Sequence, residues 1–306
     1  MQGSTTSNTA YRVGWSLRPT GWAGVLDAVG PVSTITSTGP RVLTPDEWGG
    51  GIEWDDRGWC EPVQWVAQSA CGPTVSKPGP CDTPGGGTAV PFPVYQWTGC
   101  DMNIQSLDSE LGRVASESLA GQVEVAVAAE LWASAIANPA NPTGFNPDLV
   151  RSATVIPGGP YNPREALRIG LRQWFGVVRP ASGGIGSGHG WVPWLYAPAV
   201  LLPAFLSERL VERAGSGWNV GPIRSVFSPG FGGVAPDGAG GVAAETGDVS
   251  WLILSGPVEA STAVIADVQP SNMHRLNQRL WFYELAAIVR PMVCRTIAVP
   301  VTTGGC

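Results

Sequence analysis

The chain has 306 residues, a formal net charge of −6 at pH 7, 43% hydrophobic residues and only 14% charged residues. This apolar content excludes disorder over most of the chain, and no uncharged apolar run reaches the roughly eighteen residues that a membrane span needs. Residues 1–20 lack the basic and apolar parts of a secretory signal, so we expect none there.

Charge and aromatic content bear on the partners of the chain. Lys77 is the only lysine and no basic run exists, which excludes a nucleic-acid binder that neutralises phosphates. Charged residues usually make up about a quarter of a protein, and this chain combines few of them with 14 Trp. The simplest interpretation is the bias of a GC-rich genome. We favour burial of much of the surface against other chains, and an acidic wall would suit a container for DNA.

The first hundred residues contain no helical pattern. Residues 1–45 are rich in Ser, Thr and Gly and predict an extended arm without a core of its own. Residues 46–99 are rich in Trp, Pro and Gly and predict a two-stranded excursion with a loop around 72–88. A hairpin alone is marginal in water, so this one needs a partner surface. The candidates for contact with a neighbouring subunit are Trp48, Trp54, Trp59, Trp65 and Lys77.

A long helix follows the excursion. Apolar residues at helical spacing predict it over about 107–137, with Ser106 as its N-cap and Asn138-Pro139 as its stop. At 1.5 Å per residue its length would be about 45 Å, far above that of a typical globular helix.

Two further helices are expected. Asn162 is an N-cap, Pro163 suits the first helical position, and Glu165 completes a capping box. A third helix is predicted over about 197–213, where Pro203 should kink it or delay its start.

Strands dominate the last third of the chain. Residues 223–228, 249–255, 258–268 and 288–301 are rich in β-branched residues. Trp251 to Leu254 are apolar on both faces, so this strand should be central. The order of arm, excursion, helices and strands predicts an α+β fold, without the regular alternation of a doubly wound sheet.

No catalytic chemistry is predicted. His189 lies in a Gly-rich loop and His274 in a polar stretch, and neither accompanies a nucleophile elbow, a zinc-protease motif or a phosphate-binding loop. The Gly-rich stretches 183–190 and 215–221 do not link a strand to a helix as a dinucleotide site requires. We therefore expect no catalytic residues, no metal and no cofactor.

The cysteines leave two possibilities open. No C-x-x-C pair exists among the six, so zinc is not expected. A reducing cytoplasm favours free thiols for the set as a whole. A disulfide among Cys60, Cys71 and Cys81 would instead close a short loop in the excursion and stabilise it by roughly 3 kcal/mol. Cys306, at a Gly-Gly terminus, should be free.

The tryptophans also allow a second class of function. Exposed Trp residues stack on sugars, which would make the chain a carbohydrate-binding module. Trp is equally enriched at subunit contacts, and the long helix favours that interpretation because lectin folds are mostly β-sandwiches.

Several stretches resemble, in order and spacing, structural proteins of phages that infect actinobacteria. They lie between residues 91 and 302 and include Pro91–Cys100, Val123–Trp132, Tyr161–Ala166, Phe227–Gly233 and Trp251–Val258. Those proteins resemble the HK97-type capsid family, whose fold has an N-terminal arm, an extended E-loop, a peripheral domain with a long spine helix, and an axial domain. The resemblance implies an arm at 1–45, an E-loop region at 46–99, the spine-helix part of the peripheral domain at 100–180, an axial domain at 181–250, and a return to the peripheral domain at 251–306.

The resemblance implies a major capsid protein of a tailed phage, which assembles as pentamers and hexamers into the icosahedral head shell. The alternatives are another virion structural protein, of the tail or the decoration, and the carbohydrate-binding module. Implied partners are other copies of the chain, a separate scaffolding protein, the portal and decoration proteins. The shell would enclose DNA without reading its sequence, contact no membrane, and assemble in the bacterial host cytoplasm into the virion.

Two covalent links are considered within this resemblance. Some family members join an E-loop lysine to an asparagine of a neighbour, and Lys77 is the only candidate here. No partner Asn or assisting Glu can be matched, so crosslinking is not expected. The implied fold also places Cys100 and Cys294 in one domain, which leaves a disulfide between them open.

Overall fold

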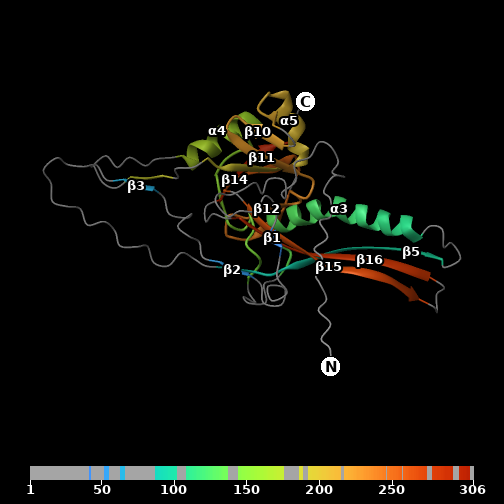
Figure 1. The fold of residues 1–306 in the computed structure, drawn as a ribbon. Helices are drawn as coiled ribbons and strands as arrows, with labels where there is room; N and C mark the ends of the chain where they lie inside the picture. Colours follow the sequence, from blue (N-terminus) through green and yellow to red (C-terminus); the bar gives the residue numbers. More distant parts are fainter. Residues whose placement is uncertain are drawn as a thin grey trace.

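A computed structural model describes thirteen stretches of the chain. They are residues 41–42, 52–54, 63–65, 87–101, 108–136, 144–175, 186–188, 192–214, 217–245, 247–256, 258–273, 278–291 and 296–303. Within them the fold is a mixture of helices and strands, as the sequence predicts, arranged around two main sheets (Figure 1).

The longer sheet has four strands. In order they are β1 (Arg41–Val42), β15 (Val258–Met273), β16 (Gln278–Pro291) and β5 (Phe92–Asp101). Helix α3 (Asp108–Trp132) lies along β16 and β5 (Figure 1). Its side chains Val123, Val127 and Leu131 follow at helical spacing and enter the core with Phe92 of β5.

The other main sheet has seven strands. In order they are β6 (Ala153–Val155), β17 (Thr296–Thr302), β14 (Val249–Ser255), β8 (Trp194–Pro198), β11 (Ile223–Ser228), β10 (Gly217–Val220) and β9 (Glu212–Ala214). Helix α4 (Pro163–Trp174) packs on β14 and β17, and a short 3-10 turn η3 (Ala199–Leu201) leads into α5 (Leu202–Ser207).

Three pairs of short strands complete the described elements. They are β12 (Val234–Pro236) with β13 (Val242–Ala244), β2 (Ile52–Trp54) with β4 (Gly87–Ala89), and β3 (Val63–Trp65) with β7 (Gly186–Gly188).

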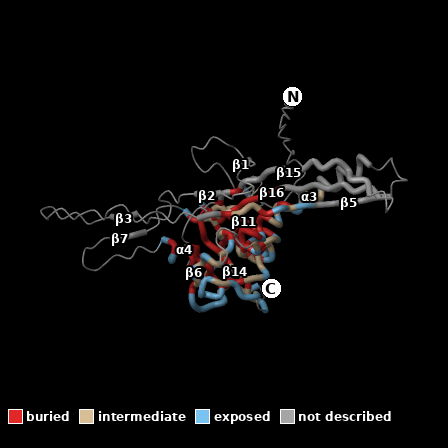
Figure 2. The backbone as a smooth tube through the Cα atoms, turned by 90° about the horizontal axis from the view of Figure 1, so that it is seen from below, coloured by how far each residue is buried: buried red, intermediate tan, exposed pale blue. Residues whose placement is uncertain are grey.

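Burial alternates along the central strands of the seven-stranded sheet. Ile253 enters one core with the C-terminal half of α3, whereas Leu252 and Leu254 enter a second core with α4 and α5. The prediction that 251–254 forms a central strand is confirmed, because β14 lies between β17 and β8. Figure 2 shows the buried backbone concentrated in this part of the molecule.

The long helix ends earlier than predicted. Its last residue is Trp132, and residues 133–136 are not helical. The cause is tertiary: the N–H groups of Leu149 and Val150 donate to the carbonyls of Leu131 and Trp132, both at 2.9 Å. The last carbonyls of the helix therefore accept hydrogen bonds from outside it, as carbonyls at a helix C-terminus require. The predicted cap Ser106 lies outside the described residues.

The second helix begins where predicted. The Asn162 side chain accepts the Glu165 N–H at 2.9 Å, and Pro163 occupies the first turn. The capping box is only half formed, because the Glu165 carboxylate binds Arg168 instead of the backbone at Asn162.

Two other predictions were wrong in their extent. The helix predicted over 197–213 is confined to 199–207, with Pro203 in the first turn of α5, and residues 212–214 form β9 because they pair with β10. The strand predicted over 288–301 is two strands: residues up to 291 pair with β15, and residues from 296 pair with β14 in the other sheet.

The excursion is also shorter than predicted. Residues 92–99, assigned to it from the sequence, belong to β5 because they pair with β16. The antiparallel pair β2 and β4 joins the two sides of the excursion, with Ile52 opposite Ala89. β3 pairs with β7, which lies in the stretch 183–190 expected to be a loop.

Candidate functional site

The residues proposed for subunit contact lie mostly outside the described part of the chain. Among the contact candidates these are Trp48, Trp59 and Lys77. The cysteines Cys60, Cys71, Cys81 and Cys294 and the histidines His189 and His274 also lie outside the described residues. Trp54 and Trp65 lie in β2 and β3, and Cys100 lies in β5. The predicted contacts therefore remain proposals.

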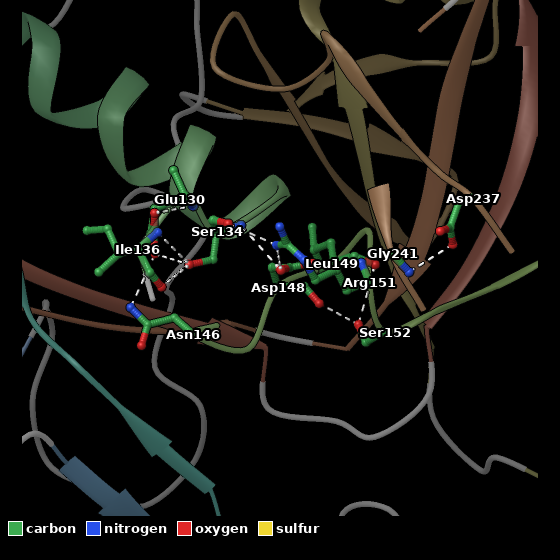
Figure 3. A network of polar contacts seen from close by, with 11 residues as sticks. Glu130, Ser134, Ile136, Asn146, Asp148, Leu149, Arg151, Ser152, Asp237 and Gly241 are labelled. Atoms are coloured by element: carbon green, nitrogen blue, oxygen red, sulfur yellow. Dashed lines mark hydrogen bonds and ion pairs between the residues drawn. The ribbon is translucent and has the colours of Figure 1, made fainter. Parts of the chain in front are cut away.

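What the structure does show is how the excursion is attached. β4 ends at Ala89, which is fully buried, and β5 begins at Phe92. The link between them runs past the C-terminal end of α3, where Asn146 bonds to Val90 of the link. Figure 3 shows the buried polar network that connects Asn146 and its neighbours with the helix.

Asn146 connects the link to the helix. Its side-chain oxygen accepts the Val90 N–H at 2.8 Å, and its amide nitrogen donates to the Val90 carbonyl at 2.9 Å. The same nitrogen donates to the Glu130 carboxylate at 3.2 Å. Asn146 is 3% exposed and Glu130 6%, so both polar groups are withdrawn from water and depend on these bonds.

Glu130 is held by the chain that follows its own helix. Ser134 donates its hydroxyl to one carboxylate oxygen, and the Ala135 N–H donates to the other at 3.1 Å. The carboxylate thereby orders the residues just beyond the last helical turn.

Asp148 and Arg151 form the second half of the network. The Asp148 carboxylate accepts the Arg151 N–H at 2.7 Å and pairs with the Arg151 guanidinium at 2.5 Å, and that guanidinium donates to the Ser134 carbonyl at 2.9 Å. Burial raises the pKa of Asp148. The hydrogen bonds from Arg151, the charge of Arg151 and the hydrogen bond from the Ser134 N–H each lower it, and burial is the largest cause. The Arg151 guanidinium also lies 3.9 Å from the centre of the Phe145 ring.

Hydroxyl groups extend the network to the seven-stranded sheet. Ser152 donates to the Asp148 carbonyl and lies 3.4 Å from the Thr296 hydroxyl at the start of β17. Thr296 in turn lies 3.1 Å from the Ser255 hydroxyl at the end of β14. One set of contacts therefore links α3, the root of the excursion and the adjacent ends of β17 and β14 in the second sheet.

An aromatic cluster forms a second connection between α3 and the seven-stranded sheet. Trp132 stacks on Phe231 with ring centroids 5.1 Å apart and donates its indole N–H to the Val234 carbonyl at 3.0 Å. Tyr196 of β8 meets the same Phe231 edge-on at 6.2 Å and donates its hydroxyl to the Gly256 carbonyl at 2.7 Å.

Two further findings concern metal ions and membranes. Among the described residues no group of three His, Cys, Asp or Glu side chains is placed to hold a metal ion. Likewise, none of the helices that the structure describes is both long and apolar enough to cross a bilayer.

Comparisons with known proteins find likeness in structure only. No protein-family model matches the chain, and no curated protein matches its sequence. The chain is similar in fold to solved phage and capsid structures. One is from Mycobacterium phage Bobi, at 13% identity and a TM-score of 0.46, covering 100% of this chain and 96% of that one. Another is from Gordonia phage Cozz, at 10% identity and a TM-score of 0.43, covering 86% and 91%. A third is the capsid of an empty GTA particle, at 8% identity and a TM-score of 0.46, covering 86% and 88%.

No pattern in the sequence indicates the buried network. Its members Asn146 and Asp148 flank Pro147, and all three residue types are common in turns. The one local signal is the spacing of Asp148 and Arg151, three residues apart with opposite charges. The contact of Asn146 with Val90 spans 56 positions, and no periodicity indicates it.

Proposed function

We propose that this chain is the major capsid protein of a tailed phage, with an HK97-like fold, and that it assembles as pentamers and hexamers into the head shell that encloses the genome. The observation that supports this most directly is the attachment of an excursion at the point where a long helix, a long sheet and a second sheet meet. Together with the sequence resemblance over residues 91–302, it matches the plan of a shell subunit.

The dimensions of the long elements favour an assembling protein. The 16 residues of β15 extend about 50 Å and the 25 residues of α3 about 37 Å. α3 packs on β16 and β5, so it covers one face of this sheet. In the proposed shell, the face of this sheet away from α3 would pack against neighbouring subunits.

In this proposal α3 with the four-stranded sheet is the peripheral domain, and the seven-stranded sheet with α4 and α5 is the axial domain. The strand pairing groups the chain differently from the segments expected from sequence. Residues 249–255 and 296–302 pair with each other, and β14 also pairs with β8, so they belong with the axial strands. We keep residues 1–45 as the arm and shorten the E-loop region to end at β4.

The expected partners are other copies of the chain, a separate scaffolding protein, the portal and decoration proteins. The net charge of −6 supports a wall that encloses DNA without binding its sequence. We propose that assembly takes place in the cytoplasm of the bacterial host and that the product is the virion.

Electron microscopy and sedimentation velocity of the purified full-length chain, with and without a co-expressed scaffolding protein, test the proposal. Closed shells or rings of five and six subunits are expected. A chain that sediments as a monomer under both conditions would contradict it. In virions, a shell protein should be the dominant band, whereas a tail or decoration protein would be present in fewer copies or on the outside only. Binding of a glycan array, lost on substitution of Trp54 and Trp65, would instead favour the carbohydrate-binding module.

The proposal includes the absence of enzyme activity. His189→Ala and His274→Ala should leave assembly intact. A hydrolase or transferase activity that either substitution abolishes would contradict this part.

A further inference from the structure

We propose that Asn146 is a positioning residue: by pairing with the backbone of Val90 it fixes the direction in which the excursion leaves the subunit, and shell assembly depends on it. The assembly half of this inference rests on the proposed function. The structural half, that Asn146 holds the root of the excursion to α3, stands independently of it.

The contact between Asn146 and Val90 has two hydrogen bonds. Asn146 engages both the N–H and the carbonyl of one residue, at 2.8 and 2.9 Å, as a neighbouring strand does in an antiparallel ladder. A single hydrogen bond would leave the peptide free to rotate about it. Two bonds to the same residue determine both its position and its orientation.

Asn146 is itself held in place. Its amide nitrogen also donates to Glu130, and Glu130 is fixed by Ser134 and the Ala135 N–H. Glu130 lies in the last turn of α3, two residues before the helix ends at Trp132. This part of the helix packs in the core. Asn146 thus holds the link between β4 and β5 to a part of α3 that packs in the core.

Val90 lies at the root of the excursion. It directly follows β4, whose partner β2 stands on the other side of the excursion, and it precedes β5 of the long sheet. Any chain of 32 residues that leaves and returns at one point, as the number between β2 and β4 allows, reaches at most about 55 Å. A small rotation at the root would therefore displace residues at the far end by several ångströms. Since a neighbouring subunit must receive the excursion, control of its direction matters more to assembly than to the folding of the subunit.

The choice of residue type supports the same role. Glu130, Ser134, Asn146 and Asp148 are all buried beside an apolar core that contains Leu131 and Trp132. Apolar side chains would fill this space without the cost of removing polar groups from water, and a fully bonded polar network instead specifies one geometry.

The test compares Asn146→Ala with the matched control Asn162→Ala. Both substitutions remove an asparagine side chain that accepts a backbone N–H, and only the first touches the excursion. Asn146→Asp is the second variant: it keeps an acceptor for the Val90 N–H and loses both bonds donated by the amide nitrogen. Each full-length chain is measured for hydrogen exchange of a peptide spanning 87–95 and for the assembled fraction, at a temperature well below its melting point.

In Asn146→Ala the exchange at Val90 should accelerate roughly fivefold to tenfold, as expected for loss of a hydrogen bond, and the assembled fraction should fall by a similar factor. Asn146→Asp should assemble poorly while retaining part of the protection at Val90. Asn162→Ala should change neither. If exchange at Val90 is unchanged in Asn146→Ala, Asn146 does not hold the backbone of Val90. If exchange is faster but Asn146→Ala assembles as well as Asn162→Ala, Asn146 does not position the excursion for assembly. If the unsubstituted chain forms no shells, the proposed function fails, and the assembly half of this inference fails with it. The exchange measurement still decides whether Asn146 holds the backbone of Val90.

Discussion

Gly230 lies so close to Val125 that a β-carbon built on the glycine would stand 2.3 Å from the Val125 carbonyl oxygen and 2.8 Å from the Ala128 β-carbon. The loop after β11 therefore meets the backbone of α3 directly, beside the stacked pair of Trp132 and Phe231. Only glycine allows this close approach. The contact therefore fixes the position of the loop after β11 relative to α3.

Gly230→Ala should lower the free energy of unfolding by about 1–3 kcal/mol, because an overpacked contact against backbone atoms must shift the loop. Chemical denaturation of the unassembled chain measures the effect. Gly221→Ala is the comparison: Gly221 has a φ of 56° and nothing within 4 Å of an added β-carbon, so its loss would come from backbone strain alone. Gly230 has no positive φ, so its loss would come from the close contact alone, and a Gly230→Ala variant as stable as the unsubstituted chain would contradict the prediction.

Trp132→Phe should lower the free energy of unfolding by about 1–3 kcal/mol, because it removes the indole donor and leaves the Val234 carbonyl without this bond. The stacking on Phe231 is partly kept by the smaller ring. Thermal unfolding of the unassembled chain checks the prediction. A loss no larger than that of an exposed substitution such as Phe175→Leu would contradict it.

The buried carboxyl of Asp148 predicts a pH dependence with a defined sign. Burial raises its pKa in the folded state above the unfolded value, so the folded state binds the proton more tightly. The contribution of Asp148 to stability therefore falls as the pH rises from the ordinary aspartate range through this raised pKa, and is constant above it. The stability of the unsubstituted chain relative to Asp148→Asn should decrease with pH across that window, as measured by denaturation at a series of pH values.

Asp237 supplies the opposite case for comparison. The N–H groups of Ala239 and Gly241 lower the pKa of its carboxyl, at 2.7 and 2.8 Å. Its contribution is present above the ordinary aspartate pKa and is lost as the pH falls through the lowered value. Stability relative to Asp237→Asn should therefore rise with pH, in the window below that for Asp148. If stability relative to Asp148→Asn also rose with pH, burial would not raise the pKa of Asp148, and the prediction would be contradicted.

The N-cap of α4 predicts a modest local effect. Asn162→Ala should lower the free energy of unfolding by about 1 kcal/mol, because the Glu165 N–H loses its acceptor. Asn162→Ser should remain close to the unsubstituted chain, since serine also caps. Circular dichroism during thermal unfolding distinguishes the two, and equal losses would indicate that the cap does not contribute.

The strand register bears on the disulfide considered between Cys100 and Cys294. Cys100 lies opposite Arg279, near the start of β16, and β16 ends at Pro291, which is about 40 Å further along the strand. Three residues beyond Pro291 span at most about 10 Å. We therefore predict that Cys100 is alkylated without reductant in intact particles, whereas the set Cys60, Cys71 and Cys81 stays open to either state. A Cys100–Cys294 peptide in a non-reducing mass map would contradict the register.

Local signals predicted the elements that local interactions control. Asn162 and Pro163 marked the start of α4 because capping depends on residues within one turn. Trp251 to Leu254 marked a central strand because both faces of β14 are buried, and apolar character on both faces is the direct consequence. Pro203 likewise marked the start of α5, since proline is tolerated in a first turn and not later.

Boundaries depended on partners distant in sequence. Residues 133–136 are Ala, Ser, Ala and Ile, which could continue a helix, yet α3 stops at Trp132 because Leu149 and Val150 bind the last carbonyls. The alternation across 288–301 is continuous in sequence, although the two ends of this stretch pair in different sheets.

The amino-acid sequence alone therefore determined the α+β class, the long helix, the start of α4 and the central strand, because each follows from residues within a few positions of one another. Only the tertiary structure decided that Asn146 meets Val90, that Gly230 lies on α3 and that Glu130 and Asp148 share one buried network. These contacts join residues between 16 and more than a hundred positions apart, and hydrogen bonding and close packing at such separations leave no periodic pattern in the sequence.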